Sequence, residues 1–177
     1  MKKLLIVIPF ICVLLLMSDV YAQKNSDGIS PKPVTATINA KGTVLSPISV
    51  VFTRDLDFGN DILPGINRSI DKNSNSAGKF SILGEAGKEI SIEMSLPPEL
   101  ISGENHLAIS FTATDAGYVI PGGTVVEFDP ATPPVSATFG TDGAMDVLLG
   151  GTVQPIFTQP AGLYEGSVTV IFYYTGN

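Results

Sequence analysis

Apolar and polar residues alternate with a period of two along most of the chain after residue 33. Val168, Val170, Phe172 and Tyr174 give the clearest example, because every second position there is large and apolar. This alternation is typical of a β-strand with one face in a core and the other in solvent. The same pattern, bounded by Gly, Pro and polar residues, predicts further strands at 34–41, 48–58, 80–82, 90–94, 107–113, 125–128 and 145–149.

These short strands predict an all-β protein, an antiparallel β-sandwich, with a closed barrel as the alternative. We expect residues 80–82 and 90–94 to form a β-hairpin across the Gly-rich turn between them. Gly150-Gly151 is expected to interrupt a strand. No segment has the 3.6-residue periodicity of an amphipathic helix, and only residues 98–106 are candidates for a short helical turn.

The first 22 residues have the pattern of a secretory signal peptide. Two lysines precede an apolar run at 4–17, and Ala22 ends a cleavage motif of small residues. A retained membrane anchor is the alternative, but the run is shorter than the about 20 residues that span a bilayer. We therefore expect a signal peptide (1–22), a flexible tail (23–33) and one β-sandwich domain (34–177), exported to the cell surface, the extracellular medium or the periplasm.

Composition excludes several classes of function. The chain has a net charge of −7, which disfavours binding to nucleic acid or to anionic lipid. It contains one His and one Cys, too few for a multi-ligand zinc site or a disulfide framework. Apart from the run at 4–17, no apolar stretch approaches membrane-spanning length, so we expect no direct membrane insertion of the mature chain. We also expect no cofactor.

Two pairs of carboxylates are candidates for chemistry. Asp55 with Asp57, and Glu127 with Asp129, would each share one face of a strand, because residues two apart point the same way. Such a pair can hold a cation or carry out acid–base work. The alternative is that they are solvated edge charges that discourage aggregation of the sheet.

The remaining polar motifs also give little support for catalysis. The segment 71–75 resembles the start of a calcium loop, but Ser76 and Ile82 stand where that loop needs a glycine and a glutamate. His106 is the only histidine, and no serine lies in a G-x-S-x-G context. We therefore expect a non-enzymatic protein with no metal site.

Four short motifs follow one another along the chain: Thr37-Ile38-Asn39-Ala40, Leu56-Asp57-Phe58-Gly59, Gly84-Glu85-Ala86-Gly87 before Ile90-Ser91-Ile92, and Ala161-Gly162-Leu163-Tyr164-Glu165-Gly166 before Val168-Thr169-Val170. In this order they resemble a family of bacterial secreted domains known only as a domain of unknown function (number four-four-zero-two). The resemblance covers residues 34–175. That family is similar in turn to spore-coat-U domains and to archaic chaperone–usher pilins.

The resemblance implies an immunoglobulin-like, pilin-like sandwich that assembles by donor-strand exchange. It also implies a periplasmic chaperone, an outer-membrane usher and copies of the chain itself as partners. Gly162 stands twelve residues before Tyr174, as in the last strand of pilin subunits. Pilins place that tyrosine next to last, whereas three residues follow Tyr174, and many pilins carry a disulfide that the mature chain lacks.

A strand donor must lie near one end of the chain and be apolar at every second position. The segment 34–41 meets this requirement and forms the candidate donor strand, with residues 41–43 as a short linker to the next strand. The alternative is an ordinary first strand that pairs within its own domain, because periodicity does not identify the partner. The inward positions of the candidate donor are Val34, Ala36, Ile38 and Ala40, and those of the candidate acceptor edge are Val168, Val170, Phe172 and Tyr174.

Three functions remain open at this point. The first is a structural subunit of a bacterial cell-surface filament, pilus or coat that takes part in adhesion. The second is a monomeric secreted or periplasmic binding module that presents loops such as 60–76 or 130–142. The third is an enzyme that acts on surface polymers through a carboxylate pair. Gly162 and Tyr164 are expected to be structural, with the Tyr164 hydroxyl fixing a loop at a strand corner.

Overall fold

The computed structural model describes residues 35–176, in which the alternating segments from residue 48 onward contain β-strands. The strand predicted at 34–41 is wrong for its described residues 35–41, which belong to no strand. The described part of the chain contains no helix, so none there could cross a membrane, and the all-β prediction is confirmed. The strands are β1 (Ser49–Arg54), β2 (Arg68–Ile70), β3 (Gly78–Leu83), β4 (Glu89–Ser95), β5 (Glu99–Ser102), β6 (Asn105–Ser110), β7 (Ala116–Val119), β8 (Val126–Phe128), β9 (Val135–Thr138), β10 (Ala144–Leu149), β11 (Gly151–Gln154) and β12 (Thr169–Tyr174).

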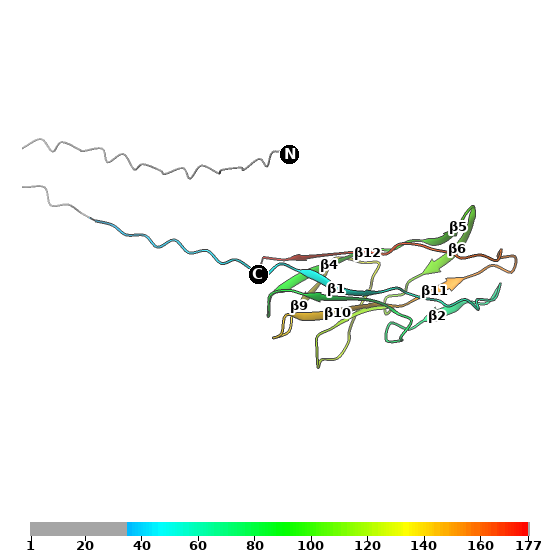
Figure 1. The fold of residues 1–177 in the computed structure, drawn as a ribbon, viewed down its shortest axis with the longest axis horizontal. Coiled ribbons are helices and arrows are strands. Elements are labelled where there is room, and N and C mark those ends of the chain that lie inside the picture. The colour runs from blue at the N-terminus through cyan, green and yellow to red at the C-terminus, as the bar shows by residue number, and fades with distance from the viewer. Residues whose placement is uncertain (1–34, 177) are drawn as a thin grey trace, which may run out of the picture. The chain divides into compact units, whose positions relative to one another are not determined.

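The strands assemble into three antiparallel sheets (Figure 1). A five-stranded sheet has the order β1-β3-β10-β7-β8, and a three-stranded sheet has the order β12-β4-β9. The four-stranded sheet β2-β11-β6-β5 lies at the end of the domain opposite the C-terminus. The arrangement is consistent with the predicted β-sandwich.

The main core lies between the five-stranded and the three-stranded sheet. Ile82 of β3, Ile92 of β4 and Val147 of β10 are at most 1% exposed. A second buried cluster under the four-stranded sheet contains Phe58, Leu107, Ile109 and Val153. The inward positions of alternating segments thus supply both clusters, as a period of two requires.

The predicted break at Gly150-Gly151 lies where the chain passes from one sheet to another. β10 ends at Leu149 in the five-stranded sheet, and β11 begins at Gly151 in the four-stranded sheet. A side chain at Gly150 would collide with the carbonyl oxygen of Ile70, so glycine alone fits this crossing. The break therefore lets one extended run contribute to both cores.

The predicted hairpin of residues 80–82 and 90–94 is wrong. β3 pairs with β1 and β10, whereas β4 pairs with β12 and β9, so the two strands belong to different sheets. The turn between them crosses the sandwich, and Phe139 packs against Gly84 at this corner. The sequence pattern identified the inward faces of both strands correctly. These faces pack into one shared core from two different sheets, whereas a hairpin would place the two strands side by side in one sheet.

The helical turn suggested for residues 98–106 is also wrong. This stretch contains β5, the turn at 103–104 and the start of β6, and β5 and β6 pair as an antiparallel hairpin. Gly103 adopts φ of 61° in the turn, a left-handed conformation that glycine reaches without strain. A tight β-turn thus replaces the predicted helical one.

The chain divides at Gly42 into two units, residues 1–42 and 43–177. The predicted signal peptide and tail, together with Val34, lie outside the described residues. Residues 35–42 are exposed and belong to no strand. The first strand of the domain begins only at Ser49.

Candidate functional site

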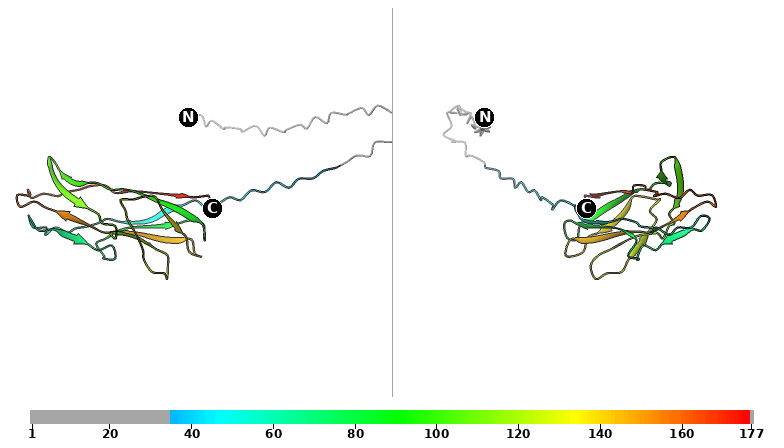
Figure 2. Two further views of the ribbon diagram at one scale, coloured as in Figure 1. Left: turned by 180° about the vertical axis from the view of Figure 1, so that it is seen from behind. Right: turned by 45° about the vertical axis from the view of Figure 1, so that its right-hand side comes forward.

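One side of the sandwich is bounded by two unpaired strand edges. β12 is the last strand of the three-stranded sheet, and β1 is the last strand of the five-stranded sheet. In residues 35–176, no strand pairs with the outer edge of either one. Figures 1 and 2 show both strands running to the end of the domain that holds the C-terminus. We call this side the open edge, defined by β1 and β12.

The backbone of β12 offers hydrogen-bonding groups to the open edge. The N–H of Thr175 donates to the carbonyl of Glu89 on the neighbouring strand, at 3.2 Å. In an antiparallel ladder, successive residues point their N–H and C=O alternately to the two sides of the strand. The backbone groups of Val170, Phe172 and Tyr174 therefore point away from β4, toward the open edge.

The side chains along the open edge form an incompletely covered part of the core. Val170, Phe172 and Tyr174 point inward but are only half-buried, whereas Ile90 and Ile92 on the adjacent β4 are 0% and 1% exposed. Half-buried apolar side chains in and around β1 and β3, across the open edge from β12, also pack on the main core. These are Ile48, Leu56 and Phe80. The predicted acceptor residues thus lie where the core has too little cover.

A tyrosine fixes the relative position of the two edges. The hydroxyl of Tyr174 donates to the carbonyl of Ser46 and accepts from the N–H of Glu85, each at 2.7 Å. The N–H of Ser46 in turn donates to the Glu85 carboxylate at 3.0 Å. The segment that leads into β1 is therefore held at the C-terminal end of β12. The sequence pattern identified Tyr174 and named Glu85 only as part of a turn motif, and it gave no signal for Ser46.

Acidification is expected to weaken this connection. Hydrogen bonds from the side chain and then from the backbone N–H of Ser46 hold the pKa of Glu85 below its ordinary value of 4.5. A lowered carboxylate pKa contributes stability above the unfolded-state value, and this stability is lost as the pH falls through the folded-state value. The melting temperature of the wild type should exceed that of Glu85→Gln by a small margin at pH 7. The margin should shrink below pH 4.5, and a margin that is the same at all pH values would contradict this account.

The predicted donor residues carry exposed apolar side chains in a segment without secondary structure. Ile38 is 93% exposed, and Ala36 and Ala40 are exposed as well. Val34 lies outside the described residues. Residues 35–41 belong to no strand in the described part of the chain.

Gly162 and Tyr164 lie beside β5. The hydroxyl of Tyr164 donates to the carbonyl of Pro160 and accepts from the side-chain amide of Gln159, each at 2.8 Å. A side chain at Gly162 would come within 2.8 Å of the Ser102 hydroxyl, so the chain can approach β5 closely only with glycine here. These contacts hold the loop before β12 in place.

The carboxylates that the sequence proposed for chemistry have other partners. Asp57 accepts from the N–H of Gly59 at 2.8 Å, and Asp129 accepts from the N–H of Ala131 at 2.9 Å. Glu127 pairs with Lys72, and Asp55 is exposed. No group of three acidic or metal-ligating side chains capable of holding a cation occurs among residues 35–176.

The other polar candidates are surface features. His106 forms an exposed pair with Glu99, with 2.9 Å between Nδ1 and Oε1. Asp71 accepts from the N–H of Asn73 at 2.7 Å, so its carboxylate organises its own loop. These contacts match ordinary surface and turn structure.

Lys72 is a buried charge that sequence analysis missed. Its side chain is 7% exposed, and Nζ lies 2.7 Å from Glu127 Oε1 and 2.8 Å from the Thr114 carbonyl. A lysine in a polar loop normally points to solvent, so no local signal marks it. The ion pair ties this loop to the β7–β8 hairpin.

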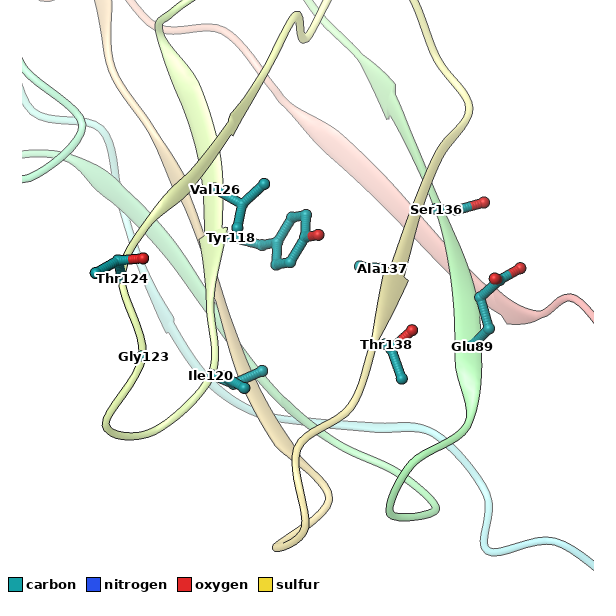
Figure 3. A pocket seen from close by; sticks show the side chains of 9 residues that line it. All are labelled: Glu89, Tyr118, Ile120, Gly123, Thr124, Val126, Ser136, Ala137 and Thr138. Atoms are coloured by element: carbon teal, nitrogen blue, oxygen red, sulfur yellow. The ribbon is translucent and has the colours of Figure 1, made fainter.

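A shallow hollow of about 410 Å³ lies on the other side of the sandwich, between the β7–β8 hairpin and β9 (Figure 3). Tyr118 and Val126 line one wall, and Ala137 lies opposite. Its polar groups are the Glu89 carboxylate, the Tyr118 hydroxyl and hydroxyl groups along β9 and the β7–β8 loop. Specific small-molecule sites usually have a few polar groups that converge on one ligand, whereas the polar side chains of this hollow are spread around its rim (Figure 3).

The chain matches no protein-family model and no curated protein sequence. Its functional interpretation therefore depends on the geometry of the open edge.

Proposed function

We propose that this protein is an exported, non-enzymatic subunit of a bacterial cell-surface filament, pilus or coat, with an immunoglobulin-like, pilin-like sandwich. Neighbouring subunits join when the segment 34–41 of one copy pairs with β12 of the next. The observation that carries the proposal is the open edge, where unpaired backbone groups and half-buried apolar side chains occur together. An added strand supplies ladder hydrogen bonds and side chains for the incomplete core.

The direction of the chain favours a neighbour as the donor to β12. Because Tyr174 holds Ser46 at the C-terminal end of β12, the chain's own segment 34–41 could return only by running parallel to β12. A strand from another copy can run antiparallel, and every ladder in residues 35–176 is antiparallel. Antiparallel pairs are slightly more stable per residue. Such head-to-tail contacts produce open filaments when the rotation does not close.

The proposed partners follow from the same exposed edge. An unpaired apolar edge favours aggregation of the free subunit. A periplasmic chaperone that covers the edge, and an outer-membrane usher that receives the subunit, would meet this need. Export by cleavage of residues 1–22 belongs to the same proposal.

Disulfide trapping tests the exchange directly. The only cysteine is Cys12, so all variants carry Cys12→Ser. Chains with Ile38→Cys are mixed with chains that carry cysteine at 170, 172 or 174 in turn, and at least one mixture should give a cross-linked heterodimer. Ile171→Cys is the matched control, because the side chain of Ile171 points to the opposite face of β12 and is 53% exposed.

The outcomes separate the hypotheses. Heterodimers at an inward position but not with Ile171→Cys support exchange between copies. A disulfide that forms only within one chain carrying both cysteines would instead show self-pairing. Absence of either disulfide, with a monomeric chain, would reject the filament subunit and leave a β-sandwich binding module, with the hollow of Figure 3 as its first candidate surface.

A further inference from the structure

A group of exposed apolar side chains occupies the end of the domain opposite the C-terminus. They come from the loop before β2 and from the segment after β11, which lie together at this end (Figure 1). Phe157 is 89% exposed and Leu163 is 75% exposed. We call these residues the apolar tip, defined by Leu63, Ile66, Ile156, Phe157 and Leu163. Phe157 lies over Gly65 in the loop before β2, whereas Leu163 follows Gly162 beside β5, at the other edge of the four-stranded sheet.

The two loops of the apolar tip are connected by specific contacts. The N–H of Gly65 donates to the carbonyl of Pro155 at 3.1 Å. The ring of Phe157 lies over Gly65, where a Cβ would come within 2.5 Å of it. The side-chain amide of Gln159 donates to the carbonyl of His106 and to the Tyr164 hydroxyl, at 3.0 and 2.8 Å. The exposed side chains are thus held on a preformed surface, which lowers the entropy lost on binding.

The geometry of strand exchange places the body of the donor subunit near this surface. β12 runs from the side of the apolar tip toward the C-terminus, so an antiparallel donor strand runs toward the tip. Residues 41–48 then lead into β1 of the donor and can extend about 26 Å. From Thr169 back to Leu163 the chain covers at most about 20 Å. The start of the donor domain can therefore reach the Leu163 side of the tip.

The donor subunit has an apolar surface of its own where its chain enters β1. Val44 is 96% exposed, two residues before Ser46, and Leu83 is 42% exposed opposite Ser49. These side chains arrive together with the start of the donor domain, because β1 and β3 are paired. Contact between this surface and the apolar tip would remove both apolar surfaces from water.

We propose that the apolar tip docks a second copy of this chain, and that the occupant is the surface around Val44 and Leu83 of the subunit whose strand has been accepted. This inference rests on the proposed function and adds a second contact to the same junction. A strand alone leaves the two domains connected only by the residues between 41 and Ser46. The tip contact would fix their relative orientation and slow their separation.

The test uses the full chain in the Cys12→Ser background. The double variant Phe157→Ser, Leu163→Ser should lower the extent of assembly about tenfold at a fixed subunit concentration, measured by sedimentation. Val126→Ser is the matched control, because Val126 is 45% exposed and lies away from the tip on β8. In a second measurement, chains with Phe157→Cys mixed with chains with Val44→Cys should form a cross-linked heterodimer.

The two proposals fail in different ways. If cysteine at 38 still traps β12 of another copy, but the tip variant assembles like the control and the 157–44 pair does not cross-link, the tip contact is wrong and strand exchange stands. If cysteine at 38 traps no position on β12 of another copy, both proposals are wrong. Loss of assembly in the tip variant with trapping at 38 retained supports the tip contact.

Discussion

Replacing Glu127 with leucine should lower the free energy of unfolding by about 3 kcal/mol. The Lys72 ammonium is almost completely buried and is held by the Glu127 carboxylate and the Thr114 carbonyl. Leucine removes the countercharge while still covering the site, so the ammonium would remain buried with a single acceptor. An uncompensated buried charge is far more costly than a missing ion pair. Equilibrium denaturation in urea measures the loss.

The reverse substitution should be mild. Lys72→Met keeps most of the side-chain volume and removes the charge that must be buried. The side chain of Glu127 is 54% exposed, and Thr114 is exposed, so water can satisfy both after the change. We expect a change in the free energy of unfolding within about 1 kcal/mol. Equal losses in Glu127→Leu and Lys72→Met would show that the attraction between the charges, rather than the burial of Lys72, determines stability.

Ile38→Asp should abolish assembly without changing the stability of the single domain. Ile38 is 93% exposed in the free chain, so a charge there meets only water. In the proposed exchanged state, the same side chain enters the apolar space beside β12, where a carboxylate has no partner. The desolvation of that charge should weaken assembly more than about 100-fold, measured by sedimentation.

Thr37→Asp is the matched control for Ile38→Asp. It adds the same charge one residue away, on the opposite face of the same extended segment. Assembly should persist in this variant, and deletion of residues 23–40 should give a folded monomer or an unstable product. If Ile38→Asp and Thr37→Asp assemble equally well, segment 34–41 does not insert in the predicted orientation.

The longer strands were predictable because each contains several complete alternations. The inward residues of β12 and β10 were identified correctly from their spacing. β7, β9 and β11 have four residues each, and β2 has three, so they contain too few alternations to stand out. The hairpin error at β3 and β4 has another cause, since two strands that share a core look the same in sequence whether or not they pair.

The candidate site was predictable only in part. The inward residues of β12 followed from their period of two, but only the sheet order shows that β12 lies at an edge with its core face half-covered. Lys72 and the exposed apolar loops gave no periodic signal, because loop residues have no fixed spacing relative to the core. Their roles follow from which loops lie next to one another.

The sequence by itself determined that the chain forms β-strands and which side chains of the longer strands face inward. Those properties depend on neighbours along the chain, because successive side chains of an extended backbone point to opposite faces. The tertiary structure decided which strands pair, which edges stay open and which charge is buried. Such contacts join distant residues, as between Tyr174 and Ser46, 128 positions apart, and local periodicity carries no information about partners at that separation.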